Sequence, residues 1–424
     1  MRILVITRNA WDDTNAIGNT ISNFFDGIDN IEFANIYFRS SQPNNVVCKN
    51  YYRVTEKDIL KNWCFPQKMG KSFKVNSTEK RESSKSSRNE RKIIRFIQKY
   101  GLHAAYKFSD YLWYSERWIN KNLDDFIEDF SPDIIFSFVK SAPQYYLTVK
   151  HLREKFNIPL LSWVADDEYS ELLKNGEHNK IKNLQYILKE SSVIKGCSEE
   201  ICDYYGNVFG CSMTPLYKGC DFKFPIKESV GNPIKMVYAG NLLYGRLEII
   251  SKISDIIEKY SSTVQSVSFD IYSNTLLTAS EIQEKFENKL STHYKGRQDY
   301  SIIQEQLAKA DIVLHVESFE NDQILKTKYS FSTKIIDALQ SGSVLLAVGP
   351  EEVASIRYIQ KIPGAYVISN IETINDELEC VFGESCEYVD RAKKIRRYAE
   401  EYHNGEENSK KTAETLKSVI GGNL

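Results

Sequence analysis

The sequence predicts an α/β protein with two doubly wound domains, each built on a parallel sheet. Short apolar runs of strand length recur along the chain, and each is followed by a polar or glycine-bearing loop and then a helical pattern. The runs form two series separated by a proline-bounded stretch at residues 225–233. The 424 residues are enough for two or three domains with sizeable cores.

The apolar runs place the predicted strands. The first series comprises residues 3–7, 133–138, 159–164, 192–196 and 214–217. The second series comprises residues 235–239, 266–272, 311–316, 344–348 and 365–368. We therefore expect domains at residues 1–222, with a basic insertion at 66–100, and at residues 234–385. The charged stretch 386–424 has a helical pattern with a break around His403 and Gly405, and we expect it to pack back toward the first domain.

Composition excludes several classes of protein. The 55 Lys and Arg residues against 57 Asp and Glu leave a formal charge of -2, which argues against nucleic acid as a partner. The apolar stretch Ile3 to Ile6 is too short for a signal-peptide core, and no apolar run is long enough to cross a bilayer. These features predict a folded cytoplasmic protein.

The eight cysteines contain no Cys-x-x-Cys pair, which favours reduced thiols. Cys197, Cys202, Cys211 and Cys220 cluster enough to raise the possibility of zinc. Their wide gaps cross a predicted helix and two predicted strands, so the interpretation as buried free thiols is favoured. No Asp-x-Asp metal signature occurs either, so we expect neither a metal nor another cofactor.

One segment differs from the rest of the chain in its charge composition. From Lys68 to Lys99, eleven cations face three carboxylates, a local charge of +8, and an aromatic segment follows at residues 100–118. Cations are attracted to anionic lipid, and Trp and Tyr favour the membrane interface. Residues 68–118 are therefore predicted to hold the protein at the inner face of the cell membrane. The alternative is a solvated loop, with the aromatic residues packing a helix into the first domain.

Ligands of open parallel sheets bind beyond the carboxyl ends of the strands. In the second domain the sequence following Tyr329 is the most informative. Ser332 is a predicted N-cap that would leave the amides of Thr333, Lys334 and Ile335 free for an anion. A lysine in a first helical turn opposes the macrodipole, so an anionic ligand would explain Lys334, and Asp337 could accept hydrogen bonds from ribose hydroxyls. The alternative is a solvated Lys-Asp pair.

The stretch from Tyr329 through Gly342 resembles the E-x7-E region of GT-B glycosyltransferases, particularly family 4. The resemblance implies two Rossmann-like domains facing across a cleft, with the nucleotide sugar held by the second. Asp337 stands where the family has the second Glu, which binds the ribose. Tyr329 replaces the first Glu, which contacts the donor sugar. The lysine in this turn resembles a variant of bacterial surface-polysaccharide transferases.

Three other segments extend this resemblance. Tyr238 to Leu242 looks like the family's glycine loop, with Gly240 conserving the turn, Asn241 in the place of the usual Arg, and Arg246 as the nearest cation for the donor diphosphate. Residues 192–221 resemble the segment before the interdomain crossover. Residues 310–317 resemble the strand that leads into the donor site, and His315 within it is predicted to be a core residue. The loop containing Arg297 also follows a predicted strand and joins the donor-site candidates.

The first domain supplies two candidate loops. Arg8, Gly18 and Asn19 follow the first strand, where the family approaches the acceptor or the donor phosphate, although Gly18 could equally be a plain turn glycine. Asp166 and Asp167 follow a buried strand, where a carboxylate could take the proton of an acceptor hydroxyl. Their alternative role is to cap the next helix.

The resemblance implies a glycosyltransferase that moves a sugar from a nucleotide donor, UDP-linked, to a glycan or lipid-linked acceptor in surface-polysaccharide synthesis, with retention of configuration. Two other functions stay open. A nucleotide-sugar epimerase shares the architecture. A degenerate, non-catalytic partner subunit is suggested by Tyr329 and Asn241, which replace functional residues of the family.

Overall fold

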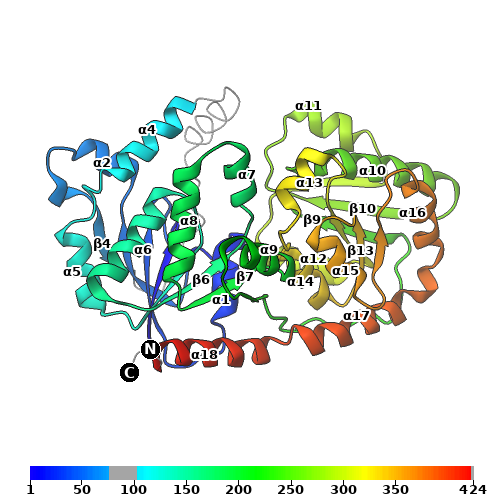
Figure 1. Ribbon diagram of the computed structural model, residues 1–424. Coiled ribbons are helices and arrows are strands. Elements are labelled where there is room, and N and C mark those ends of the chain that lie inside the picture. Colours follow the sequence, from blue (N-terminus) through cyan, green and yellow to red (C-terminus); the bar gives the residue numbers. More distant parts are fainter. Residues whose placement is uncertain (76–102, 422–424) are drawn as a thin grey trace. The chain divides into compact units, whose positions relative to one another are not determined.

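The computed structural model describes residues 1–75 and 103–421 and divides into two compact units (Figure 1). Unit 1 comprises Met1–Leu216 together with Ser409–Leu424, and unit 2 comprises Tyr217–Asn408. The first boundary, after Leu216, falls six residues before the expected end of the first domain. The second boundary, after Asn408, falls inside the C-terminal helical stretch. Most of the predicted basic insertion at 66–100 lies outside the described residues, which omit 76–102.

In the described part of unit 1, eight strands form one sheet in the order β4-β3-β2-β1-β5-β6-β7-β8. The strands are β1 (Arg2–Thr7), β2 (Glu32–Tyr37), β3 (Cys48–Arg53), β4 (Lys71–Lys74), β5 (Ile134–Phe138), β6 (Leu160–Val164), β7 (Val193–Gly196) and β8 (Thr214–Pro215). All neighbours are parallel except β3 and β4, which pair antiparallel, so the predicted parallel sheet carries an antiparallel edge. The strand order reverses between β1 and β5.

The helices of unit 1 connect these strands and pack on the sheet. They are α1 (Ala16–Phe24), α2 (Glu56–Lys61), α4 (His103–Tyr114), α5 (Lys121–Phe130), α6 (Pro143–Phe156), α7 (Tyr169–Lys174), α8 (His178–Glu190) and α9 (Glu199–Phe209). A single 3-10 turn, η1 (Pro66–Lys68), precedes β4. Helices α6 and α8 lie side by side in front of the sheet in Figure 1. Because helices cover the central strands, β1 and β5 are apolar and fully buried along most of their length.

The strand β2 shows why some strands escaped prediction. Its sequence includes Asn35, which interrupts the apolar run yet is fully buried. The Asn35 side chain donates to the carbonyl of Val5 at 3.0 Å and to the hydroxyl of Thr7 at 2.8 Å, and it accepts from the amide of Trp11. A buried amide is tolerated here because its hydrogen bonds are satisfied by the neighbouring strand.

The described part of unit 2 contains a six-stranded sheet in the order β11-β10-β9-β12-β13-β14, with every neighbouring pair parallel. The strands are β9 (Ile234–Ala239), β10 (Val267–Tyr272), β11 (Thr292–Gly296), β12 (Ile312–Val316), β13 (Val344–Val348) and β14 (Tyr366–Ile368). The order reverses between β9 and β12. A ligand site is expected at the carboxyl ends of these two strands.

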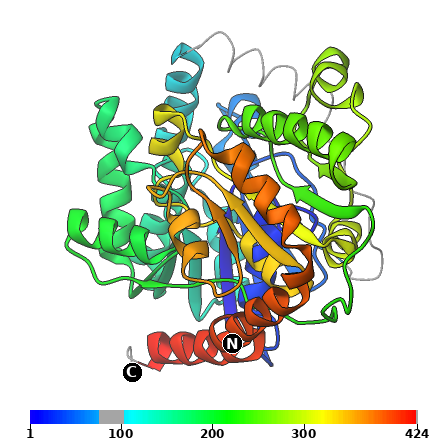
Figure 2. The same ribbon diagram turned by 90° about the vertical axis from the view of Figure 1, so that its right-hand side faces the viewer.

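Helices lie on both sides of this sheet, as Figure 2 shows. They are α10 (Arg246–Thr263), α11 (Ala279–Ile282), α12 (Tyr300–Lys309), α13 (Asn321–Thr327), α14 (Lys334–Ser341), α15 (Ala354–Gln360), α16 (Ile374–Gly383) and α17 (Tyr388–Tyr402), with short turns at Gln283–Glu287 and Ser385–Glu387. Helix α10 packs against α16, whereas α14 packs against α12 and α17. The sheet is therefore covered by helices, and its central strands β12 and β13 are buried throughout.

The predicted break in the C-terminal stretch separates α17 from α18 (Gly405–Gly421). His403 is fully buried at this break, and its carbonyl accepts from the amide of Cys220 at 2.7 Å. The amide of Gly405 in turn donates to the Cys220 carbonyl at 3.0 Å. Beyond the break, the Ser409 hydroxyl donates to the carbonyl of Asp26, which ties the end of the chain to unit 1.

Two findings concern membranes and metals. In the described residues, no helix combines the length and the apolar character needed to cross a bilayer. The same residues contain no group of three or more His, Cys, Asp and Glu side chains placed to hold a metal ion. Cys202 and Cys220 are buried free thiols, Cys211 is a partly exposed one, and Cys197 is buried. The predicted independence from metal stays a prediction.

Candidate active site

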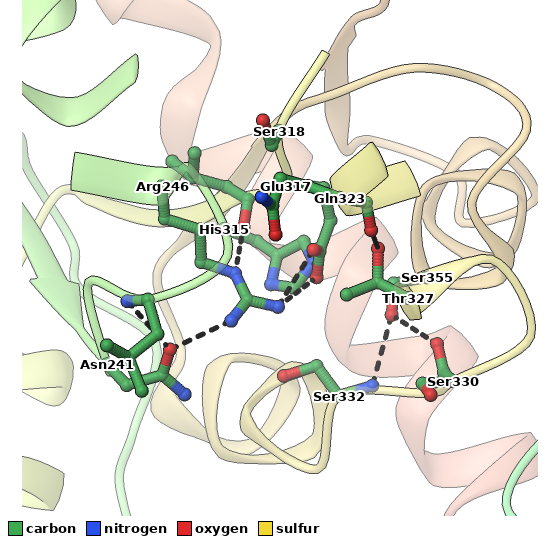
Figure 3. A network of polar contacts seen from close by, with 12 residues as sticks. Asn241, Arg246, His315, Glu317, Ser318, Gln323, Thr327, Ser330, Ser332 and Ser355 are labelled. Carbon is green, nitrogen blue, oxygen red and sulfur yellow. Dashed lines mark hydrogen bonds and ion pairs between the residues drawn. The ribbon is translucent and has the colours of Figure 1, made fainter. Parts of the chain in front are cut away.

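A group of polar residues follows the carboxyl ends of β9 and β12, the two strands between which the strand order reverses. Asn241 follows β9, and Glu317 and Ser318 follow β12. Between them lies Arg246, the first residue of α10. Figure 3 shows these side chains converging from the two loops.

Arg246 is held by protein groups on three sides. Its Nη2 donates to both carboxylate oxygens of Glu317, at 2.8 and 2.9 Å, and its Nη1 donates to Oδ1 of Asn241 at 2.9 Å. Its Nε donates to the carbonyl of Val316 at 3.0 Å. In the sequence analysis Arg246 was the nearest cation for the diphosphate, and that donor role stays a prediction. The residue is a buried structural anchor that joins the two loops.

Glu317 is the centre of this network and exposes only 2% of its area. Burial alone would raise the pKa of its carboxyl, but His315 and Arg246 outweigh the burial and hold that pKa below its ordinary value. The Nε2 of His315 lies 3.3 Å from Oε1 of Glu317, without the geometry of a hydrogen bond. His315 is buried, as predicted from its strand, and its ring lies beside Glu317.

The start of α10 depends on two residues with positive φ. Tyr244 has φ 58° and Gly245 has φ 73°, and together they turn the chain so that Arg246 begins the helix facing β12. A Cβ at Gly245 would stand only 2.4 Å from the Ser318 hydroxyl oxygen. Glycine is therefore required twice here, for its conformation and for the space.

Gly245→Ala is expected to lower the free energy of unfolding by about 2–3 kcal/mol, because it combines a left-handed conformation with a steric clash. The matched control is Gly176→Ala, which has φ 67° but no atom within 4 Å of the added Cβ. That control should cost about 1 kcal/mol. Urea unfolding of both variants measures the difference, and equal losses would contradict the steric part of the explanation.

The helix α14 begins differently from the prediction. Its N-cap residue is Thr333, which has helical φ and ψ and makes no side-chain cap hydrogen bond. Ser332 was predicted to be the cap, and this is wrong. Its carbonyl accepts from the amide of Ile335 at 3.0 Å, so the Ile335 amide is not free for an anion as predicted. The amide of Ser332 itself donates to the Ser355 hydroxyl at 3.0 Å. In the described structure, the amides of Thr333 and Lys334 have no hydrogen-bond acceptor.

Lys334 is a cation without a bonded partner. Within residues 1–75 and 103–421, its ammonium group has no hydrogen bond and no ion pair, although the side chain is only partly exposed. Burial, and after it the charge of Arg246, lowers the pKa of Lys334 to about 8. A Cβ at Gly240 would lie 3.0 Å from Lys334 Nζ, so the glycine leaves the space beside the ammonium open. A partly buried, unpaired cation of this kind is suited to an anionic ligand.

Asp337 lies one turn beyond Lys334 and has protein partners on one oxygen. Its Oδ1 accepts from the Lys218 ammonium at 3.0 Å and from the Tyr300 hydroxyl at 2.7 Å. Lys218 is itself buried, so the pair is largely shielded from solvent. The alternative interpretation, a solvated pair of Lys334 and Asp337, is therefore wrong, since Asp337 pairs with Lys218.

The remaining donor-site candidates are Arg297, Tyr329 and Asn241, which lie in three separate loops outside α14. Arg297 is exposed in the turn after β11. Tyr329 lies between α13 and α14, where the Lys328 ammonium stands 5.4 Å from the centre of its ring. Asn241 has a structural role, because its Oδ1 also accepts from the amide of Leu243. The structure thus joins Gly240, Lys334 and the start of α14, while donor roles for Arg297 and Tyr329 stay predictions.

Unit 1 has a pocket of about 750 Å³ at the corresponding reversal of its strand order. Its walls come from the carboxyl ends of β1, β5 and β6, and they include Arg8, Gly18, Lys140, Glu168 and Tyr145. The Lys140 ammonium pairs with Glu168 at 3.0 Å, and Glu168 Oε2 accepts from the amide of Ser141 at 2.8 Å. This pair fixes the loops after β5 and β6 to each other.

Asp166 and Asp167 are placed differently from Glu168. The Asp166 side chain is 62% exposed and lies 3.4 Å from the Lys140 ammonium. Asp167 Oδ1 accepts from the amide of Ser170 at 3.2 Å and from the Tyr205 hydroxyl at 3.2 Å, so it caps the first turn of α7. Its Oδ2 is buried without a partner. The capping role that the sequence left open is present, and a catalytic role for the two aspartates stays a prediction.

Gly18 and Asn19 lie in the first turn of α1. A Cβ at Gly18 would stand 2.1 Å from the carbonyl oxygen of Asp12, so the glycine is needed for close backbone packing. Its amide donates to the N-cap Asn15. Asn19 continues the helix by donating its amide to the Asn15 carbonyl. Of the three predicted loop residues, Arg8 and Gly18 line the pocket.

Sequence reasoning missed Lys140 and Glu56, which contribute charged groups to the pocket beside Glu168. Glu56 Oε1 accepts from the Ser109 hydroxyl at 2.8 Å and from the Trp113 indole at 3.3 Å. Lys140 lies two residues beyond the predicted strand 133–138, and this position at a carboxyl end could have identified it. Glu56 follows β3, a strand that was not predicted, so it had no such signal.

Neither a protein-family model nor a curated protein sequence matches the chain. Solved structures nevertheless resemble it over its whole length. Sucrose-phosphate synthase from Thermosynechococcus elongatus has a TM-score of 0.65 at 8% identity, with 100% of both chains covered. Anabaena HepE in complex with UDP has a TM-score of 0.61 at 12% identity, with 99% of this chain and 100% of that chain covered.

WaaG, a glycosyltransferase involved in lipopolysaccharide biosynthesis, has a TM-score of 0.58 at 12% identity, with 99% of this chain and 100% of that chain covered. The chain has the GT-B fold. The predicted fold class, with two Rossmann-like units on parallel sheets, is thereby confirmed. Membership of family 4 stays a prediction.

Proposed function

We propose that the chain is a glycosyltransferase that takes a sugar from a nucleotide sugar and transfers it to a glycan acceptor. The observation that carries this proposal is Lys334, an unpaired and partly buried ammonium at the reversal of strand order in unit 2. A diphosphate supplies the anion that this cation lacks. The open amides of Thr333 and Lys334 add the partial positive charge of the helix N-terminus at the same place.

In this proposal the site of unit 2 stabilises the departing nucleoside diphosphate. As the bond between the sugar and the diphosphate breaks, negative charge grows on the leaving oxygen, and Lys334 is placed to stabilise it. Asp337 has two hydrogen bonds on Oδ1, and we assign its Oδ2 to a ribose hydroxyl of the donor. Lys218 and Tyr300 keep that carboxylate in place.

The acceptor is assigned to the pocket of unit 1. Its mixture of ion pairs, hydroxyl and amide groups with the aromatic rings of Trp11 and Tyr145 suits a polyhydroxylated sugar. We propose UDP as the nucleotide, since HepE of the same fold binds UDP. The resemblance to surface-polysaccharide transferases supports a glycan or lipid-linked acceptor and retention of configuration.

A nucleotide-sugar screen tests this function. At a concentration of 100 times its dissociation constant, a donor should stabilise the protein by roughly 2.7 kcal/mol, which a thermal-shift assay detects. Transfer to an oligosaccharide acceptor, or slow donor hydrolysis, is the expected activity. Interconversion of two free nucleotide sugars would instead identify an epimerase, and binding without any turnover would identify a non-catalytic partner.

Glu168→Gln is expected to raise the acceptor KM on the order of tenfold while leaving the donor Kd unchanged, because loss of the charge on Glu168 frees Lys140 and loosens a pocket wall. Steady-state kinetics with varied acceptor measures this. Asp166→Asn and Asp167→Asn are the matched comparisons. A tenfold loss of turnover in either aspartate variant, with a normal Glu168→Gln enzyme, would move the acceptor chemistry to the aspartates.

A further inference from the structure

One surface of unit 1 exposes large apolar side chains among cations. It consists of the exposed side chains of residues 57–68 and 107–117, which belong to α2, η1 and α4, and we call it the α2–α4 surface. Leu60, Phe65, Phe108 and Tyr111 expose 50, 61, 53 and 62% of their area. Exposure of this extent at four neighbouring positions is unusual for a surface that meets only water.

The two segments form one continuous surface. The ring of Trp63 stacks on that of Tyr111, with centroids 6.3 Å apart and 23° between the planes. The guanidinium of Arg117 lies 5.1 Å from the centre of the Trp63 ring, and its Nε donates to the Trp63 carbonyl at 3.1 Å. Phe108 precedes Tyr111 by three residues in α4, so both project from one side of that helix. Helices α2 and α4 are also in contact (Figure 1).

The charge of this surface is positive. Its exposed cations are Lys57, Lys61, Lys68, Lys107 and Arg117, and Glu116 is an exposed carboxylate among them. The other two carboxylates in these ranges are already used, because Asp58 closes the capping box of α2 and Asp110 pairs with Lys180. The Lys68 ammonium lies 5.0 Å from the Phe65 ring centre, so a cation and an exposed aromatic ring are neighbours here.

We propose that the α2–α4 surface docks unit 1 on an anionic lipid bilayer. Aromatic side chains favour the membrane interface, and each Lys or Arg near anionic lipid adds attraction. A protein partner fits less well, because protein interfaces are depleted in lysine and four of these five cations are lysines. The proposal concerns location and does not rest on the proposed sugar transfer.

The structure changes the membrane prediction made from residues 68–118. Trp113 and Trp118 are buried in unit 1, so these two tryptophans pack the core, as the alternative held. Residues 57–67 were not part of the prediction, and they belong to the surface. The expected contribution of residues 76–102 lies outside the described residues.

The test is co-sedimentation of the full chain with vesicles of neutral phosphatidylcholine or of phosphatidylcholine with 30% phosphatidylglycerol. Binding is expected with the anionic vesicles and should weaken with salt. The variant Phe65→Ser, Phe108→Ser, Tyr111→Ser should bind at least tenfold less. Each neutralisation among Lys61→Gln, Lys107→Gln and Arg117→Gln should weaken binding about fivefold.

The matched control is Val264→Ser with Leu290→Ser, two exposed apolar residues of unit 2, which should bind as the wild type does. Circular dichroism and melting temperature establish that each variant is folded. Undiminished vesicle binding by the folded triple variant would overturn the proposal, as would equal binding to neutral and anionic vesicles. Self-association of the wild type that the triple variant loses, without vesicle binding, would assign the surface to a protein contact.

Discussion

Lys334→Met is expected to weaken binding of a UDP-sugar by about 1.5–3 kcal/mol, roughly ten- to a hundredfold, because one charge-assisted bond to the diphosphate is lost. The same change should raise the stability of the unliganded protein at pH 7, since a partly buried ammonium without a bonded partner is removed. Titration calorimetry with UDP-sugars and urea unfolding measure the two effects. The control is the exposed Lys326→Met, which should change neither.

The pH dependence of this effect has a definite sign. The pKa of Lys334 is about 8 in the folded protein and near its ordinary value of 10.5 when unfolded. Below pH 8 the lysine is charged in both states, and the folded state bears the full cost of burying the charge. Between pH 8 and 10.5 the folded state releases its proton first, so wild-type stability rises relative to the variant. The stabilisation by Lys334→Met should therefore be largest below pH 8 and shrink above it.

Donor affinity should decline as the pH rises through 8, because the cation that binds the diphosphate loses its charge. An unchanged affinity in a folded Lys334→Met variant would remove this residue from the donor site. It would leave the fold and the proposed acceptor pocket untouched.

Breaking the Arg246–Glu317 pair is expected to have the largest effect on stability. Arg246→Met leaves the carboxylate of Glu317 buried without the Nη2 group that donates to both of its oxygens, which should cost about 3–5 kcal/mol of unfolding free energy. Glu317→Leu leaves the buried guanidinium and should cost a similar amount. The double variant Arg246→Met, Glu317→Leu should lose much less than the sum, since no buried charge is left unpaired.

Denaturant unfolding of the four proteins completes this double-mutant cycle. The pKa of Glu317 is lowered in the folded state, so its contribution is fully present above the unfolded pKa and is lost as the pH falls through the folded value. Donor binding by the double variant is a second readout. Retained affinity agrees with a purely structural Arg246, whereas a loss like that of Lys334→Met would restore its predicted contact with the diphosphate. If the losses of the two single variants simply added in the double variant, the explanation by an unpaired buried charge would be wrong.

The central strands were predictable because both faces of a parallel sheet are covered by helices. Because of this burial, apolar residues predominate along β1, β5, β6, β12 and β13. The strands β3, β4 and β11 lie at or near sheet edges, where polar side chains meet water and this predominance is lost. These three, with the Asn-containing β2, were the strands that the sequence analysis missed.

The site divides in the same way. Lys334 stood out in the sequence because a cation in a first helical turn opposes the helix dipole, and this anomaly is local. The partner of Arg246 is not local, since Glu317 lies 71 residues away and reaches it only when β9 and β12 pair. Nothing in the spacing of Asp337 reveals Lys218, which is 119 residues away.

The sequence by itself determined the two doubly wound units, their central strands, and the helix that carries Lys334 and Asp337, because periodicity and local charge express these features within one segment. Only the tertiary structure decided which charged groups are paired. Arg246, Asp337 and Lys140 meet partners from distant segments, whereas Lys334 meets none among the described residues. Pairing of charges depends on distances between loops that the strand order brings together, and those distances are fixed only when the sheet forms.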